Sequence, residues 1–211
     1  MKKVCVIVAH ADDEILGAGG TMAKHAAAGD EVGVLVMCGR GMRAEDQTAV
    51  GPLALEAVGG KGFQSLSHPD QKFDTVSILS LTIYIENFIS EHKPEIIYTH
   101  SAGDLNMDHR ITHKAVLTAC RPLPGSSVRE IYGMEIASST EWGYAFYPTH
   151  FVDITGIPLE KKLAALECYK AEMREPPHAR SVMRVMAMAV CRGGEVGVMH
   201  AEAFTTIRRI S

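Results

Sequence analysis

Residues 6–20 read VIVAHADDEILGAGG, an apolar run followed at once by a histidine, two aspartates and a glutamate. Residues 3–9 are apolar after Lys3 and rich in β-branched side chains, which predicts a parallel strand that is covered on both faces. Residues 13–28 then carry apolar side chains at helical spacing and stop at Gly29, which predicts a helix. A buried strand therefore ends where four titratable residues begin: His10, Asp12, Asp13 and Glu14.

Strand-like and helix-like segments alternate through the first two-thirds of the chain. Such alternation predicts βαβ units, an α/β fold and a mostly parallel sheet. No internal repeat or long linker divides the sequence, so we expect a single domain over residues 1–211. The expected strands cover residues 3–9, 31–38, 62–66, 95–100, 128–136, 151–154 and 199–210, and the expected helices cover residues 13–28, 53–58, 76–92, 107–120, 159–172 and 182–191.

The composition narrows the classes of partner and compartment. The 211 residues are 46% hydrophobic and 22% charged, with a formal net charge of −4. The basic residues are scattered, which gives no electrostatic reason to expect nucleic acid or an anionic membrane as a partner. Five cysteines without a CxxC pair favour a reducing compartment. The apolar run near Met1 is too short for a signal peptide, and no apolar run of the sequence approaches the roughly 20 residues of a membrane span, so we expect a cytoplasmic protein with no membrane insertion.

Open parallel sheets bind ligands at the carboxyl ends of their strands. Residues 10–14 and 99–110 lie at two such ends and are dense in nitrogen and oxygen ligands. His10 and Asp13 are three residues apart across the predicted turn, which lets both side chains point into one cleft. Zinc prefers such ligands, and a catalytic zinc site keeps one position open for water. The third ligand would be His109 or His100, and Asp12 is placed to act as a general base.

Each of these residues also has a structural explanation. Asp12 or Asp13 could cap the helix, and Glu14 would then be favourable near the positive end of its dipole. A histidine at a strand end is often structural, and Asp108 suits the first turn of a helix. Adjacent carboxylates are costly unless something positive neutralises them, which weakens the cap explanation for the whole set. Spacing alone leaves the metal site and the structural explanation both open.

Two motifs resemble those of the PIG-L/LmbE family of zinc-dependent N-deacetylases. AHADDE (residues 9–14) is similar to the family's AHPDDE signature, and GDLNMDHR (residues 103–110) resembles its second motif, HPDH or a variant close to DLNxDHR. Residues 135–142, 176–181 and 200–204 sit where many bacterial members carry similar segments, so the resemblance covers nearly the whole chain. It implies a single Rossmann-like three-layer sandwich, one Zn²⁺ per chain and a homo-oligomer.

The resemblance also implies roles for individual residues. His10 and Asp13 would be metal ligands with His109 as the third, and Asp12 the general base. Asp108 would lie near the metal and the reacting groups, and we count it with Asp12 as catalytic. Two positions depart from the family: Ala11 replaces a proline, and Asn106 replaces a histidine that stabilises the oxyanion or donates a proton. Asparagine can donate a hydrogen bond but not a proton at pH 7, so the acid would be protonated Asp12 or His100.

Further residues are candidates for substrate contact. We include Arg43, His100 and Asn106, although Arg43 could equally be a solvated surface arginine. Glu14 would support the turn or bind a substrate hydroxyl. His178 and Arg180 are candidates for lining the cleft, His113 for a position behind the metal ligands, and His200 and Glu202 for a structural role or the cleft rim.

The predicted function is hydrolysis of an N-acetyl group on an amino-sugar or sugar conjugate of the N-acetylglucosamine type. Its partner would be a small molecule. The alternatives are a non-catalytic metal- or nucleotide-binding module on the same fold and a hydrolase of another amide or ester. The GAGG run (residues 17–20) falls inside the predicted helix rather than directly after a strand, so it gives little support to a dinucleotide site.

Overall fold

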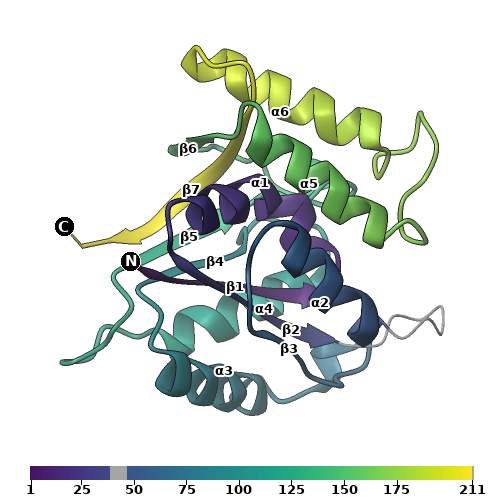
Figure 1. Ribbon diagram of the computed structural model, residues 1–211. Helices are drawn as coiled ribbons and strands as arrows, with labels where there is room; N and C mark the ends of the chain where they lie inside the picture. The colour runs from purple at the N-terminus through teal and green to yellow at the C-terminus, as the bar shows by residue number, and fades with distance from the viewer. Residues whose placement is uncertain (39–46, 211) are drawn as a thin grey trace.

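A seven-stranded sheet with the order β3-β2-β1-β4-β5-β7-β6 forms the centre of the fold (Figure 1). The computed structural model describes residues 1–38 and 47–210. The first five strands of this order are parallel, and β7 runs antiparallel to both of its neighbours. The α/β fold and mostly parallel sheet are thus confirmed. The strands are β1 (Lys3–His10), β2 (Glu31–Cys38), β3 (Phe63–Ser65), β4 (Ile96–His100), β5 (Glu130–Met134), β6 (His150–Asp153) and β7 (Ala201–Arg209).

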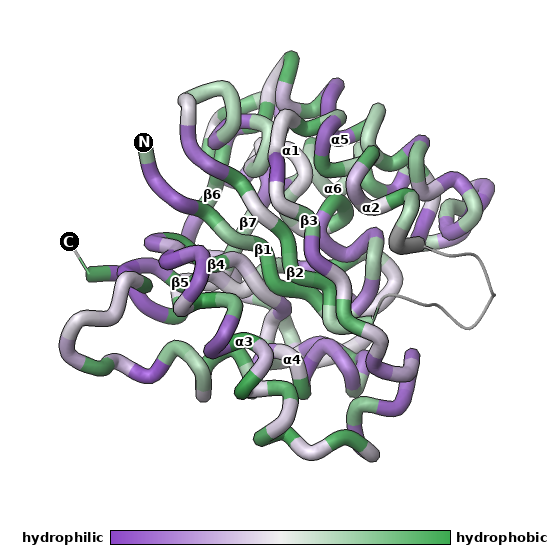
Figure 2. The backbone as a smooth tube through the Cα atoms, turned by 60° about the horizontal axis from the view of Figure 1, so that its bottom comes forward, coloured by the Kyte–Doolittle hydropathy of each residue, from purple (hydrophilic) through white to green (hydrophobic). Residues whose placement is uncertain are grey.

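Helices cover both faces of the sheet, which confirms the three-layer sandwich (Figure 1). Val4, Val6 and Val8 of β1 pack towards α1, α2 and α5, whereas Cys5, Ile7 and Ala9 pack towards α3 and α4. Figure 2 shows β1 and β2 as mainly hydrophobic strands between these helices. Helix α6 lies beyond α5 and packs on Ile154 and Leu159. The helices are α1 (Asp13–Ala27), α2 (Gln47–Ala57), α3 (Ile78–His92), α4 (Met107–Ala119), α5 (Ile157–Cys168) and α6 (Val182–Val196), with short 3₁₀ turns η1 (Phe73–Thr75) and η2 (Thr140–Trp142).

Several predicted boundaries are wrong. Helix α2 begins six residues before the predicted start and includes Pro52. Helix α5 ends at Cys168 rather than at residue 172, and residues 169–181 form turns and irregular backbone. Helix α6 continues past its predicted end through Gly193, where a Cβ atom would lie 2.6 Å from the carbonyl oxygen of Val198. The glycine at this point allows close approach of the backbone and does not end the helix.

The GAGG run lies inside α1, as predicted, and it is a packing surface. A Cβ atom on Gly17 would lie 2.5 Å from Met134 Sδ, so glycine lets α1 approach the sheet closely. The helix is interrupted at Ala18, whose φ of −139° is not helical. Glu202 of β7 accepts hydrogen bonds from the N–H groups of Gly20 (3.0 Å) and Thr21 (2.7 Å), which follow the interruption.

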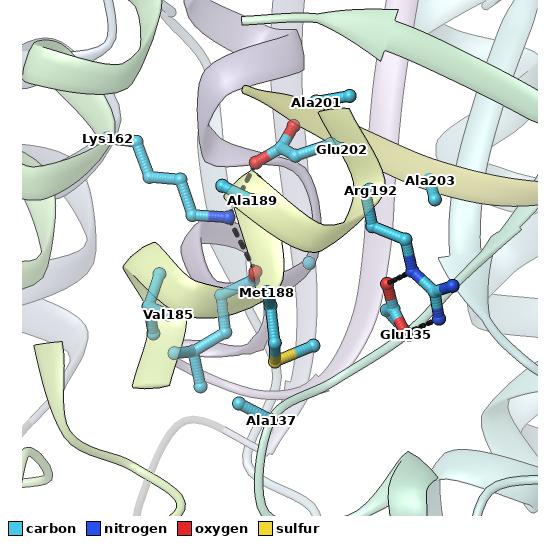
Figure 3. Close-up of a pocket in the computed structure, with 12 residues that line it drawn as sticks. Glu135, Ala137, Lys162, Val185, Met188, Ala189, Arg192, Ala201, Glu202 and Ala203 are labelled. Atoms are coloured by element: carbon cyan, nitrogen blue, oxygen red, sulfur yellow. Dashed lines mark hydrogen bonds and ion pairs between the residues drawn. The ribbon is translucent and has the colours of Figure 1, made fainter. Parts of the chain in front are cut away.

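A buried ion pair completes this arrangement (Figure 3). Lys162 Nζ of α5 donates to Glu202 Oε1 at 2.6 Å and to the carbonyl oxygen of Leu16 at 2.8 Å, on the other side of the interruption in α1. Figure 3 shows this pair and the Arg192–Glu135 pair beside one cavity of about 20 Å³, room for about one water molecule. The ion pair is therefore a structural element that fixes α1 on β7.

None of the helices in the described residues combines the length and the apolar character that a membrane span requires.

We predict that Glu202→Ala lowers the free energy of unfolding by about 3–5 kcal/mol, because it leaves the Lys162 ammonium buried without its partner. Urea denaturation measures this loss. The matched control is Glu195→Ala, which removes a more exposed carboxylate paired with Arg192 and should cost less than about 1 kcal/mol. Equal losses in the two variants would contradict the structural role of the buried pair.

Candidate metal centre

Two neighbouring strands bring the predicted ligands together. His10 is the last residue of β1 and Asp13 the first of α1, while His109 lies in the first turn of α4, shortly after β4. Strands β1 and β4 are paired in parallel, so their carboxyl ends lie at the same edge of the sheet. The three side chains meet at this edge although about ninety residues separate the two segments.

The three ligand atoms form a nearly equilateral triangle. Asp13 Oδ2 lies 3.3 Å from His10 Nδ1 and 3.2 Å from His109 Nε2, and the two nitrogens are 3.2 Å apart. A tetrahedral zinc ion with bonds of about 2.0–2.1 Å separates its ligand atoms by about 3.3 Å. Asp13 Oδ1 is buried and has no hydrogen-bond partner among the described residues. The donor set and its spacing therefore fit one tetrahedral divalent ion with a position left open.

Carboxylates fix the orientation of both imidazole rings. His10 Nε2 lies 3.2 Å from Asp108 Oδ2 and 3.2 Å from Asp70 Oδ1, and His109 Nδ1 lies 3.2 Å from Asp104 Oδ1. Such partners determine which ring nitrogen faces a metal and increase its basicity. Burial opposes protonation of His10, but its hydrogen bonds to Asp108, Asp13 and Asp70 raise its pKa well above the usual range. The same attraction would favour a divalent cation in place of a proton.

Asp12 lies beside this triangle in an unusual backbone conformation. Its φ is +101°, and although it stands at the N-terminus of α1 its side chain makes no capping hydrogen bond. Asp12 Oδ2 accepts a hydrogen bond from Arg180 Nη1 at 2.9 Å, while the buried Oδ1 has no hydrogen-bond partner in the part of the chain that the structure describes. Burial raises the pKa of Asp12 to about 7, against the lowering effect of Arg180. A strained, buried carboxylate with one free oxygen is typical of a functional residue and does not fit the cap explanation.

Glu14 supports the turn. Its Oε2 accepts the backbone N–H of Asp12 at 3.0 Å, and its Oε1 accepts the hydroxyl of Tyr169 at 2.6 Å. Burial raises the pKa of Glu14 to about 8. Both carboxylate oxygens are thus used within the protein, and this side chain helps to hold Asp12 in its strained conformation.

The residues predicted to contact substrate occupy three different positions. His100 is fully buried behind His109, with ring centroids 3.9 Å apart, and its Nε2 accepts the backbone N–H of Ala9 at 2.8 Å. Burial lowers the pKa of His100 well below its usual range, so this histidine is not placed to donate a proton at neutral pH. Asn106 caps α4 by accepting the backbone N–H of Asp108 at 2.9 Å, and its contact with substrate stays a prediction. Arg43 lies outside the described residues.

Four residues that the sequence did not single out contact the ligands or the carboxylates that hold them. Asp104 accepts a hydrogen bond from the Thr140 hydroxyl at 2.6 Å, and Ser139 Oγ contacts both Asp104 and His109 Nδ1. Asp104 lies inside the motif GDLNMDHR, so the sequence contained a signal for it. Asp70 follows no recognisable motif, and only the fold reveals its position near His10.

Of the remaining candidates, one contacts the predicted base and the others have structural contacts. Arg180 reaches Asp12, whereas His178 uses its Nδ1 to accept the backbone N–H of Arg180 at 3.0 Å. His113 lies behind His100, and its Nδ1 is 2.8 Å from the backbone carbonyl oxygen of His100. Glu202 belongs to the buried pair with Lys162.

Comparison with known proteins identifies the family. The family model described as "PIG-L: GlcNAc-PI de-N-acetylase" matches residues 5–120, which include all three candidate ligands. The chain belongs to the PIG-L family. The match covers the motif at the end of β1 and the motif at the start of α4, on which the resemblance of the sequence was based.

Solved structures share the fold over the whole chain. The conserved protein TT1542 from Thermus thermophilus is 22% identical, with coverage of 100% of this chain and 97% of that one and a TM-score of 0.81. N,N'-diacetylchitobiose deacetylase from Pyrococcus horikoshii is 20% identical over 98% and 84% of the two chains, with a TM-score of 0.79. GalB, the 4-carboxy-2-hydroxymuconate hydratase from Pseudomonas putida, is 22% identical, with coverage of 100% of this chain and 98% of GalB and a TM-score of 0.79. Because this fold carries different reactions, the reaction must be argued from the site.

We predict that Asp104→Asn lowers the affinity for Zn²⁺ by about 10- to 100-fold, because the carboxylate that orients His109 is lost. Competition with a chromogenic chelator measures the affinity. Asp153→Asn, at an exposed aspartate on β6, is the matched control and should bind as the wild type does. An unchanged affinity in Asp104→Asn would show that Asp104 does not support the ligand.

Proposed function

We propose that this protein is a zinc-dependent hydrolase that removes the acetyl group from an N-acetylated amino sugar or a conjugate of one. The observation that carries the proposal is the ligand triangle of His10, Asp13 and His109 with the unpaired Asp12 Oδ1 beside it. Membership of the PIG-L family supports the choice of substrate class. Three protein ligands of the His₂Asp type also support zinc, because catalytic zinc sites keep three protein ligands and one open position.

A zinc ion in this triangle would lower the pKa of water to about 7 and polarise an amide carbonyl. Asp12 would take the proton from the attacking water through Oδ1, since Oδ2 is occupied by Arg180. The same carboxyl would then return the proton to the departing amine, because Asn106 cannot act as an acid. Asp108 holds His10 through its far nitrogen, so it acts as a positioning residue.

We propose further properties that rest on the family and on composition. The substrate is a small molecule of the N-acetylglucosamine type, and Arg43 and Asn106 are among its contacts. Residues 1–211 form one catalytic domain. This domain assembles as a homo-oligomer. All five cysteines lie in the described residues and none of them forms a disulfide, which supports a reducing, cytoplasmic location.

The variant Asp12→Asn tests the mechanism. We expect kcat to fall by about 10²- to 10⁴-fold, because asparagine cannot accept the proton, while the zinc content stays at one per chain. The measurements are acetate release from N-acetylglucosamine and N,N'-diacetylchitobiose and metal analysis of the purified protein. A full rate in Asp12→Asn would contradict the role of Asp12.

The variant His109→Ala tests the metal centre in the same assay. It removes one corner of the triangle, so both the bound zinc and the acetate release should be lost. Asp153→Asn again serves as the control that leaves both unchanged. A wild-type protein that binds zinc but hydrolyses no acetamide would favour a non-catalytic metal-binding module.

A further inference from the structure

Arg180 reaches the candidate base from a distant part of the chain. It lies in the segment of residues 169–181, between α5 and α6, and is separated from Asp12 by 168 positions. Its Nη1 donates to Asp12 Oδ2 at 2.9 Å, and its Nε donates to Ser138 Oγ at 2.9 Å. One guanidinium group therefore connects the segment after α5 with the turn that carries Asp12 and with the segment after β5.

Both ends of this connection are held firmly. The backbone carbonyl of Arg180 accepts the N–H of Arg174 at 3.1 Å, and the next residue, Ser181, is fully buried and caps α6 through its hydroxyl. Ser138 has a φ of +71° and donates its N–H to Glu141 Oε1 at 3.0 Å. The guanidinium therefore approaches Asp12 from a fixed direction.

The carboxylate of Asp12 needs such a partner. Asp12 is 1% exposed and directly precedes Asp13, a second buried carboxylate. Two neighbouring negative charges repel each other, and within the described residues Arg180 is the one positive side chain at ion-pair distance from Asp12. Without Arg180, Asp12 Oδ2 would lose its hydrogen bond, and the carboxylate would lose the contact that fixes its orientation.

We propose that Arg180 is a positioning residue for the reaction: it holds Asp12 Oδ2 so that Oδ1 alone is presented to the reacting groups. The inference rests on the proposed role of Asp12 as the base. It requires an arginine, because Nη1 and Nε serve two partners at once in a planar group, whereas lysine offers one nitrogen on a flexible stem. Arg180 itself acts through Asp12 and takes no part in the proton transfer.

The experiment compares Arg180→Ala and Arg180→Lys with Arg174→Ala. Arg174 lies in the same segment, but its guanidinium donates to the carbonyl oxygens of Ala171 and Met173 and not to Asp12, so it is a matched control. In the zinc-loaded Arg180→Ala protein we expect kcat to fall by about 100-fold with little change in KM or zinc content, because the base is misplaced. Added guanidinium ion should raise the kcat of Arg180→Ala and leave that of Arg174→Ala unchanged.

A crystal structure of Arg180→Ala gives a readout that does not depend on activity. We expect the Asp12 carboxylate to adopt a different orientation while His10, Asp13 and His109 stay in place. An Asp12 side chain with unchanged orientation, or an unchanged kcat, would overturn the proposal. If Arg180→Ala does not fold, Arg180→Lys decides through the same two measurements. A wild-type protein that releases no acetate would refute the deacetylase assignment instead, and the crystal structure would still test the positioning.

Discussion

The site depends on the balance of buried negative charge at the start of α1. Asp12, Asp13 and Glu14 are consecutive, and none is more than 1% exposed. A buried carboxylate is tolerated only when a positive charge or hydrogen bonds compensate it. Asp13 faces the two histidines, Asp12 faces Arg180, and Glu14 accepts a backbone N–H and a tyrosine hydroxyl. A divalent cation in the His10–Asp13–His109 triangle would complete this balance.

The part of the chain after residue 120 supplies many of the side chains that compensate these buried charges and hold the ligands. The family model matches residues 5–120, which contain the ligands. Ser139, Tyr169 and Arg180 lie beyond this range, yet they contact His109, Glu14 and Asp12 in turn. Glu202 and Lys162, also beyond it, hold the interrupted helix α1 on the sheet. The ligand motifs therefore depend on the last ninety or so residues for their geometry.

The sequence predicted the elements whose signals are local. The apolar β-branched run of β1 and the spacing of His10 and Asp13 lie within one short segment. The structure brings His10 and Asp13 together with His109, as expected. Boundaries set by tertiary packing could not be predicted in this way, as the continuation of α6 through Gly193 shows. Asp70 and the Arg180–Asp12 contact depend on loops without periodic patterns, so only the fold could reveal them. His100 is buried at the end of β4, where its ring stacks on that of His109, and residue spacing does not encode this contact.

The proposed function requires one zinc ion between His10, Asp13 and His109. His10 also faces Asp70 and Asp108 through its other ring nitrogen, and these three residues form a second group that could hold a metal ion. Anomalous scattering at the zinc edge, from crystals of the zinc-loaded protein, distinguishes the two groups directly. We predict one peak at about 2.0–2.2 Å from His10 Nδ1, Asp13 Oδ2 and His109 Nε2. A peak between His10 Nε2, Asp70 and Asp108, or no peak at this edge of the sheet, would contradict the proposed metal centre.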